Sequence, residues 1–203
     1  HTHLVYAGNR KQEFADRING LTYEEIANRG GGILNSAKKL RETSEDDLFE
    51  QSKLRLKEII LQGTGSVEIK SGYGLNLESE LKMLRVIRRL KNLNWIPIKV
   101  TFLGAHSIPA EYKNNKDGYV KLIIEEMIPE IAKENLADFI DVFCEKNYFD
   151  ENDCRKIFET GRKHGLIPKI HAEQLSHTNG IKTAIECGAI SADHLEFCNN
   201  DDI

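Results

Sequence analysis

Short runs of β-branched and other apolar residues alternate along the chain with longer segments whose apolar residues recur every three to four positions. The short runs predict strands, and the longer segments predict amphipathic helices. The predicted strands are residues 1–5, 66–70, 96–103, 139–144, 166–171 and 189–194. The predicted helices are residues 45–60, 81–90, 119–131, 150–164 and 181–187. The stretch between the first strand and the first helix is polar.

The first predicted helix also carries a start signal. Ser44 is in position to cap it, and Asp47, three residues later, predicts a capping box. Its apolar face is formed by Leu48, Phe49, Leu56, Ile59 and Ile60. Gly63 and Gly65 then end the helix.

Helices long enough for crossovers separate all six predicted strands, so the sheet should be parallel. A doubly wound sheet would gather its ligands at one switch point, whereas a (β/α)8 barrel distributes functional residues over the ends of many strands. The histidines favour the barrel, because five of the seven stand where a predicted strand ends. These five are His1, His3, His106, His171 and His194.

Two of these histidines, His1 and His3, are spaced to share one face of a strand. Inside a barrel that face is the interior, where two imidazoles suit a divalent metal ion. A catalytic zinc site uses about three protein ligands, and His171 at the end of a later strand supplies a third. His164 and His177 fall on or beside helices, and we interpret them as solvated or capping residues.

Composition and charge narrow the function classes. The 28 basic and 32 acidic residues are scattered and leave a net charge of -4, which argues against a nucleic acid or an anionic membrane as partner. No apolar run reaches the ~18 residues of a membrane helix, so we expect a cytoplasmic protein. The four cysteines are too sparse for a disulfide scaffold and too far apart for a zinc pair, which predicts reduced thiols.

Six short motifs, taken together, resemble the imidazolonepropionase family of the metal-dependent amidohydrolase superfamily. In chain order they are HTHLVYAGNR, EIKSGYGL, TFLGAH, FCE, IHAEQ and SADHLE. The resemblance implies a (β/α)8 TIM-type barrel, with residues 1–203 forming part of one barrel domain. Because the chain opens at His1 without a methionine, we expect a segment with about six of the eight βα units. The family's N-terminal β domain and last barrel strands would lie outside it.

In activity, the resemblance implies a hydrolase that opens the ring of 4-imidazolone-5-propanoate, a small-molecule substrate, to N-formimidoyl-L-glutamate. One divalent ion, Zn or Fe, would activate water and polarise the carbonyl. Its ligands would be His1, His3 and His171, with an aspartate that ends the eighth strand of the family. Two-metal relatives use a carboxylated lysine at the end of strand four, where this chain has Phe143-Cys144-Glu145, so one ion is expected.

The same resemblance assigns substrate and proton-transfer roles. His194 would act near the reacting oxygen, and His106 would contact the substrate. The substrate propionate would be bound by Arg10, Tyr73 and Tyr23.

The chain departs from many relatives three residues after His171. There it has Gln174 instead of a glutamate, with Glu173 beside it. An amide binds the ring but is no base, so the choice of general base between Glu173, His194 and the missing aspartate stays open.

Two alternatives remain at this point. One is another cyclic-amide hydrolase or a nucleobase deaminase of the same superfamily, which would share the metal ligands but not the Arg10 and Tyr73 pair. The other is a catalytically inactive metal-binding module. Whether the protein forms a homodimer is also left open by the sequence.

Overall fold

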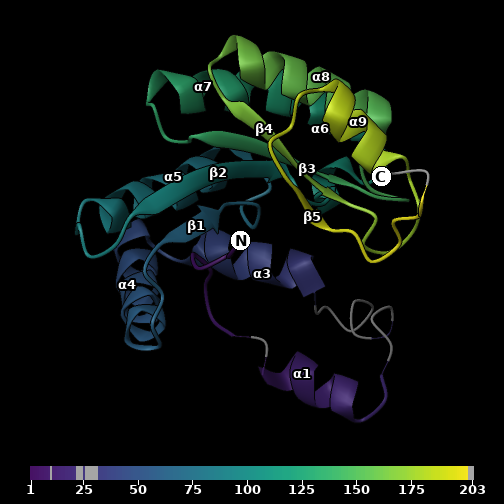
Figure 1. Ribbon diagram of the computed structural model, residues 1–203. Coiled ribbons are helices and arrows are strands. Elements are labelled where there is room, and N and C mark those ends of the chain that lie inside the picture. The colour runs from purple at the N-terminus through teal and green to yellow at the C-terminus, as the bar shows by residue number, and fades with distance from the viewer. Residues whose placement is uncertain (10, 22–24, 26–31, 201–203) are drawn as a thin grey trace.

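The computed structural model describes residues 1–9, 11–21, 25 and 32–200, and within them the chain folds as a mixed α/β structure around one parallel sheet. The sheet has the order β1-β2-β3-β4-β5 and is curled like half of a barrel (Figure 1). Its strands are β1 (Val67–Lys70), β2 (Ile98–Ala105), β3 (Phe139–Cys144), β4 (Ile167–Ala172) and β5 (Ala192–His194). Adjacent strands are also consecutive in the sequence, which is the connectivity of a curled βα sheet.

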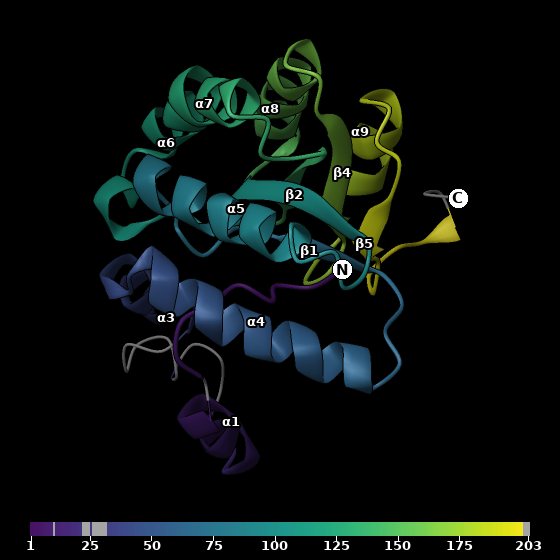
Figure 2. The same ribbon diagram turned by 90° about the vertical axis from the view of Figure 1, so that its left-hand side faces the viewer.

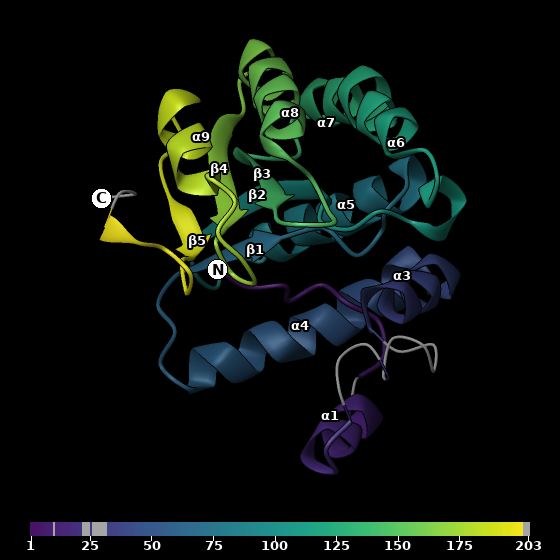
Figure 3. The same cartoon turned by 90° about the vertical axis from the view of Figure 1, so that its right-hand side faces the viewer.

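Helices cover the outer face of the sheet (Figure 2 and Figure 3). After β1 they are α5 (Leu77–Lys91), η1 (Ala110–Tyr112), α6 (Lys116–Leu122), the π-helical turn η2 (Ile123–Met127), α7 (Ile128–Lys133), α8 (Glu151–Lys163) and α9 (Gly180–Glu186). Before β1 the described helices are α1 (Lys11–Ile18), α3 (Gly32–Glu42) and α4 (Glu45–Leu61). None of the helices in the described part of the chain combines the length and apolar character needed to cross a membrane.

Strand alternation divides the sheet into an apolar outer face and a charged inner face. Ile69, Val142 and Ile170 point outward and belong to the core under the helices. Because successive side chains point to opposite faces of a strand, the residues beside them point into the curve. These inner residues include Lys70, Asp141 and His171, which are buried although polar.

The predicted elements agree with the structure from residue 45 onward, within a few residues at each boundary. The predicted helix of residues 81–90 is α5, and its apolar positions Leu81, Leu84, Ile87 and Leu90 are all buried. The four cysteines are free thiols, and they all lie in the described part of the chain.

Three expectations need correction. The sheet has five strands within the described residues and not six, because the opening residues make a single bridge, Thr2 to Ile69. The expected capping box is also absent at Ser44, whose hydroxyl accepts from the Asp47 N–H and donates to the Asp47 carboxylate. Helices α1 and α3 lie in the stretch that had been interpreted only as polar.

Candidate metal centre and substrate pocket

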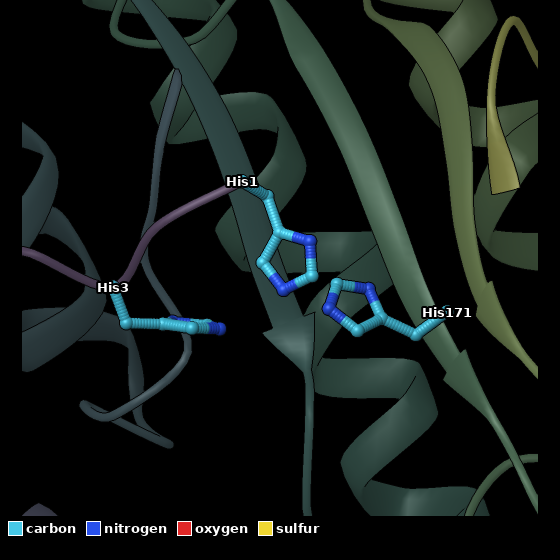
Figure 4. Close-up of side chains that lie close together, drawn as sticks. All are labelled: His1, His3 and His171. Atoms are coloured by element: carbon cyan, nitrogen blue, oxygen red, sulfur yellow. The ribbon is translucent and has the colours of Figure 1, made fainter. Parts of the chain in front are cut away.

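Three histidine side chains meet inside the curve of the sheet (Figure 4). His1 and His3 come from the opening segment, and His171 comes from β4. One possible ligand atom of each lies within 4.8 Å of those of the other two. The ring centres of His1 and His171 are 4.6 Å apart. The fold therefore brings the histidines of the opening segment close to a histidine of β4, as binding of one metal ion by all three would require.

Hydrogen bonding of the opening segment to β1 places His1 and His3. The Thr2 N–H donates to the Glu68 carbonyl at 3.0 Å, and the Lys70 N–H donates to the Thr2 carbonyl at 2.8 Å. Thr2 thus lies beside β1 like a residue of a parallel strand. This pairing directs the side chains on either side of Thr2 toward the same side.

Each of the three rings has a neighbour that influences its orientation. Nδ1 of His3 lies 3.0 Å from the Ser71 carbonyl oxygen, and Nδ1 of His1 lies 3.1 Å from Asp193 Oδ2. Burial, with the nearby His106 and His171, holds the pKa of His3 well below its usual value. His3 is therefore neutral near pH 7, which is the form of imidazole that binds a metal ion.

The environment of His171 also suits a metal ligand. Its side chain is almost fully buried, with Nδ1 3.0 Å from Asp141 Oδ2. Within the described part of the chain, the other ring nitrogen, Nε2, has no hydrogen-bond partner. A buried polar atom without a partner is costly, and coordination of a metal ion would satisfy one. The donor set and this unsatisfied ring together fit a divalent ion such as Zn or Fe.

A layer of charged residues lies on the inner face next to the histidines. Nζ of Lys70 is 2.5 Å from Asp141 Oδ2, 2.9 Å from Asp193 Oδ2 and 3.2 Å from Glu68 Oε1. Glu68 also pairs with Lys169 at 2.5 Å. Burial alone would raise the pKa of Asp141, but the adjacent His171 and Lys70 lower it to about 2.

A cavity of about 370 Å³ opens beside the histidine cluster. Among the predicted site residues, Tyr73, His106 and Gln174 line it. Its other lining residues are Arg17, Ile33, Phe143, Tyr148 and Leu175. The ring of His106 stacks on that of His3, with centres 4.9 Å apart and planes 6° from parallel. The cavity therefore adjoins the three histidines through this stacked pair.

Tight packing of the turn after β1 holds Tyr73 and His106 in place. Nδ1 of His106 lies 3.0 Å from the Gly72 carbonyl oxygen. Gly72 has a φ of +108°, and a Cβ there would lie 2.9 Å from this same nitrogen. Glycine is thus required by both the backbone conformation and the close approach of the ring.

The buried carboxylate of Glu80 binds the same turn. It accepts hydrogen bonds from the N–H groups of Gly72 at 3.1 Å, Gly74 at 2.7 Å and Leu75 at 3.0 Å. The turn that carries Tyr73 is therefore held by a side chain of α5 rather than by a strand partner.

Glu173, one of the candidates for the general base, and its neighbour Gln174 lie in different settings. Glu173 is fully buried, with a φ of +54°, and its carboxylate accepts from the N–H groups of Thr178 and Gly180, both at 2.8 Å. Gln174 lies at the cavity, and its N–H donates to Glu145 Oε1 at 2.7 Å. The structure thus brings Gln174 to the cavity and engages Glu173 in holding the start of α9.

His194 ends β5 on the same edge of the sheet. Its ring centre is 5.2 Å from that of His171 and 5.6 Å from that of His1. Its φ of +82° is unusual for a residue with a side chain. Backbone strain of this kind occurs often at functional sites. His194 therefore borders the metal centre, whereas Arg10 and Tyr23 lie outside the described residues.

Sequence reasoning missed the residues that support this site. They are Lys70, Asp141 and Asp193 in the charged layer, and Glu80 and Glu145 at the loops. The sequence contained one indication of the residues in the charged layer, because each of the three is a charged residue next to an apolar one within a predicted strand. An inward charge within a strand is uncommon unless it is paired.

Comparison with known proteins agrees with the motifs. No family model matches the chain. The chain is 59% identical over all its 203 residues to an imidazolonepropionase of Christiangramia forsetii and 61% identical to one of Flavobacterium psychrophilum. It is 51% identical over 195 residues to one of Geobacillus thermodenitrificans.

These alignments cover 100%, 100% and 96% of the chain, but 49%, 49% and 46% of the relatives. The chain thus spans about half the length of the curated relatives it matches. The resemblance drawn from the six motifs is confirmed. From end to end, the chain is similar to one segment of the imidazolonepropionases.

Proposed function

We propose that this chain forms the metal-binding part of an enzyme that hydrolyses 4-imidazolone-5-propanoate to N-formimidoyl-L-glutamate. The reaction adds one water molecule across the cyclic amide and breaks the bond between the carbonyl carbon and the ring nitrogen. The observation that carries the proposal is the convergence of His1, His3 and His171 beside the cavity that Tyr73 and His106 line. Similarity to imidazolonepropionases supports the identity of the substrate.

One divalent ion, Zn or Fe, would be held by His1, His3 and His171. When bound, such an ion activates water and polarises the carbonyl group. The full-length protein would form a complete (β/α)8 barrel, which the curled parallel sheet supports. By resemblance to the family, an aspartate that ends the eighth strand would complete the ligand set. Functional residues of such barrels lie at the carboxyl ends of the strands, as His171 and His194 do here.

The chain's own residues would bind and orient the substrate. His106 and Gln174 face the cavity, so they would donate hydrogen bonds to the ring, and the Tyr73 hydroxyl would bind the propionate together with Arg10 and Tyr23. His194 would stabilise charge on the reacting oxygen and move a proton at its ring nitrogen. Glu173 is the less suitable base because its oxygens already accept from two backbone N–H groups.

The direct test measures hydrolysis by the full-length protein loaded with Zn²⁺ or Fe²⁺. Loss of the imidazolone absorbance, with formation of N-formimidoyl-L-glutamate, is the expected result. Release of ammonia from cytosine or guanine without turnover of the imidazolone would replace the proposal with a deaminase. Tight metal binding with no turnover of any of these substrates would identify an inactive metal-binding module.

Replacing Arg10 with methionine should separate substrate recognition from metal binding. We expect bound metal to be retained, while kcat/KM for 4-imidazolone-5-propanoate falls by about 30- to 1000-fold, or ~2 to 4 kcal/mol. The reason is that the substrate carboxylate would be desolvated without its guanidinium partner. An imidazolone that lacks the propionate should lose much less.

The matched control is Lys11→Met, which removes a positive charge from the exposed neighbouring residue. It should leave kcat/KM unchanged for both substrates. Equal losses on both substrates in Arg10→Met would mean that Arg10 supports the fold or the metal centre instead of the propionate.

A further inference from the structure

Two groups of candidate metal ligands share one histidine. The first is His1, His3 and His171, and the second is Asp141, His171 and Asp193. In each group the ligand atoms lie within 4.8 Å of one another. Carboxylate and imidazole are both ligands of Zn and Fe. By donor type and spacing alone, this part of the chain has room for a second ion next to the first.

The second group also contains unsatisfied buried atoms. Asp141 is fully buried, and in the described part of the chain its Oδ1 has no hydrogen-bond partner. Nε2 of His171 is in the same condition. Buried polar atoms without a partner are uncommon in proteins, so these atoms are available to coordinate a cation.

The ammonium group of Lys70 stands where a second ion would bind. Its Nζ is 2.5 Å from Asp141 Oδ2 and 2.9 Å from Asp193 Oδ2, and its side chain is fully buried. A metal ion binds carboxylate oxygens at ~2.0 to 2.2 Å, so an ion that bound both oxygens would overlap this nitrogen.

The charge balance of the inner layer also indicates that Lys70 takes the place of a metal cation. Glu68, Asp141 and Asp193 contribute three negative charges, against two positive charges from Lys70 and Lys169. Without Lys70 the excess would rise from one negative charge to two. Buried charges that have lost their partner are strongly destabilised, and a divalent cation would restore the balance.

We propose that the Lys70 ammonium group occupies the second cation position of this centre and thereby limits the centre to one metal ion. The inference rests on the proposed metal site and adds to it the residue that sets the number of ions. Lys70 acts here as a fixed organic cation, which neutralises Asp141 and Asp193 without supplying a second Lewis acid. The same two carboxylates also contact the histidines, Asp141 at His171 Nδ1 and Asp193 at His1 Nδ1.

The test counts metal ions in the purified full-length protein after equilibration with excess Zn²⁺ and gel filtration. The unaltered protein should hold about one zinc ion per chain, and Lys70→Met should hold about two. Lys70→Gln, which keeps a hydrogen-bond donor toward Asp141, should also hold about two. Circular dichroism establishes that each variant is folded.

Three further variants locate the effect. Lys70→Arg keeps the charge and should hold about one ion. Lys169→Met removes the other buried lysine of the layer, which pairs with Glu68, and should also hold about one. Adding Asp193→Asn to Lys70→Met should return the ratio from about two to about one, because it removes a ligand of the second group.

The outcomes separate this inference from the proposed function. Folded Lys70→Met and Lys70→Gln proteins that each hold one ion, as the unaltered protein does, would overturn the role of Lys70 and leave the hydrolase proposal intact. A second ion that persists after Asp193→Asn would also overturn it. If the unaltered protein holds one ion but does not hydrolyse the imidazolone, the proposed function fails while the ion count still tests Lys70.

Discussion

Replacing His171 with alanine in the full-length protein should abolish metal binding and reduce turnover of 4-imidazolone-5-propanoate by more than about 1000-fold. His171 belongs to both candidate ligand groups, so its loss removes a donor from each. Without the ion, water is no longer activated at neutral pH, and the remaining residues only bind and orient the substrate. Metal content by elemental analysis and kcat/KM with added Zn²⁺ or Fe²⁺ are the two measurements.

The matched control is His164→Ala. His164 is exposed at the end of α8 and belongs to neither ligand group of the described residues. This variant should keep both its metal and its activity. A His171→Ala protein that is folded and holds a full complement of metal would contradict the assignment of His171 as a ligand.

Replacing Glu80 with alanine in the full-length protein should lower the free energy of unfolding by ~3 kcal/mol. Three backbone N–H groups of the turn after β1 would lose their buried acceptor. An orphaned buried donor costs ~1 to 3 kcal/mol. We expect the cost for the three N–H groups together to lie near the lower limit of this range, at ~1 kcal/mol each. Burial disfavours the charged carboxylate and raises the pKa of Glu80, and this cost offsets part of the stability that the hydrogen bonds provide in the unaltered protein.

Thermal and urea unfolding measure this effect, with two variants for comparison. Glu80→Gln keeps one oxygen for Gly74 and Leu75 and should lose less stability. Glu78→Ala changes an exposed residue at the start of the same helix and should cost no more than ~1 kcal/mol. Equal losses in Glu78→Ala and Glu80→Ala would show that the helix, and not the turn, depends on these carboxylates.

The same experiment links the turn to the site. Tyr73 lies between two of the residues whose N–H groups Glu80 binds, and the Gly72 carbonyl oxygen lies 3.0 Å from a ring nitrogen of His106. Loosening the turn should therefore raise KM for the imidazolone in any Glu80→Ala protein that remains folded, while bound metal stays unchanged. A loss of metal with an unchanged KM would contradict this positioning role.

The fold could be predicted well where local pattern and tertiary packing agree. The spacing of Leu84, Ile87 and Leu90 predicted α5 because the same face of the helix is buried against the sheet. Helix α3 was missed because it buries few apolar residues, and two of its four buried positions are Gly32 and Ser36. The strand predicted at residues 1–5 was counted in error because local sequence does not show how far a segment pairs with its neighbour, and here the pairing is a single bridge from Thr2 to Ile69.

By itself, the sequence determined which residues stand at the ends of strands, because the two-residue and 3.6-residue periods of strands and helices are local properties. It thereby placed His106, His171 and His194 at the carboxyl ends of strands, whereas the strand expected at His1 and His3 is a single bridge from Thr2 to Ile69. The motifs then indicated the family, which the comparisons support along the whole chain.

Only the tertiary structure decided what surrounds these histidines. Glu68 and Lys70 share one face of β1, and curling of the sheet turns that face inward, so that Glu68 is partly buried and Lys70 fully buried. Charges that lose their hydration need partners, and those partners come from strands more than 70 residues away, at Asp141 and Asp193. Asp141 and Asp193 each contact both Lys70 and a histidine, and these contacts depend on strand order and register, which no local pattern encodes.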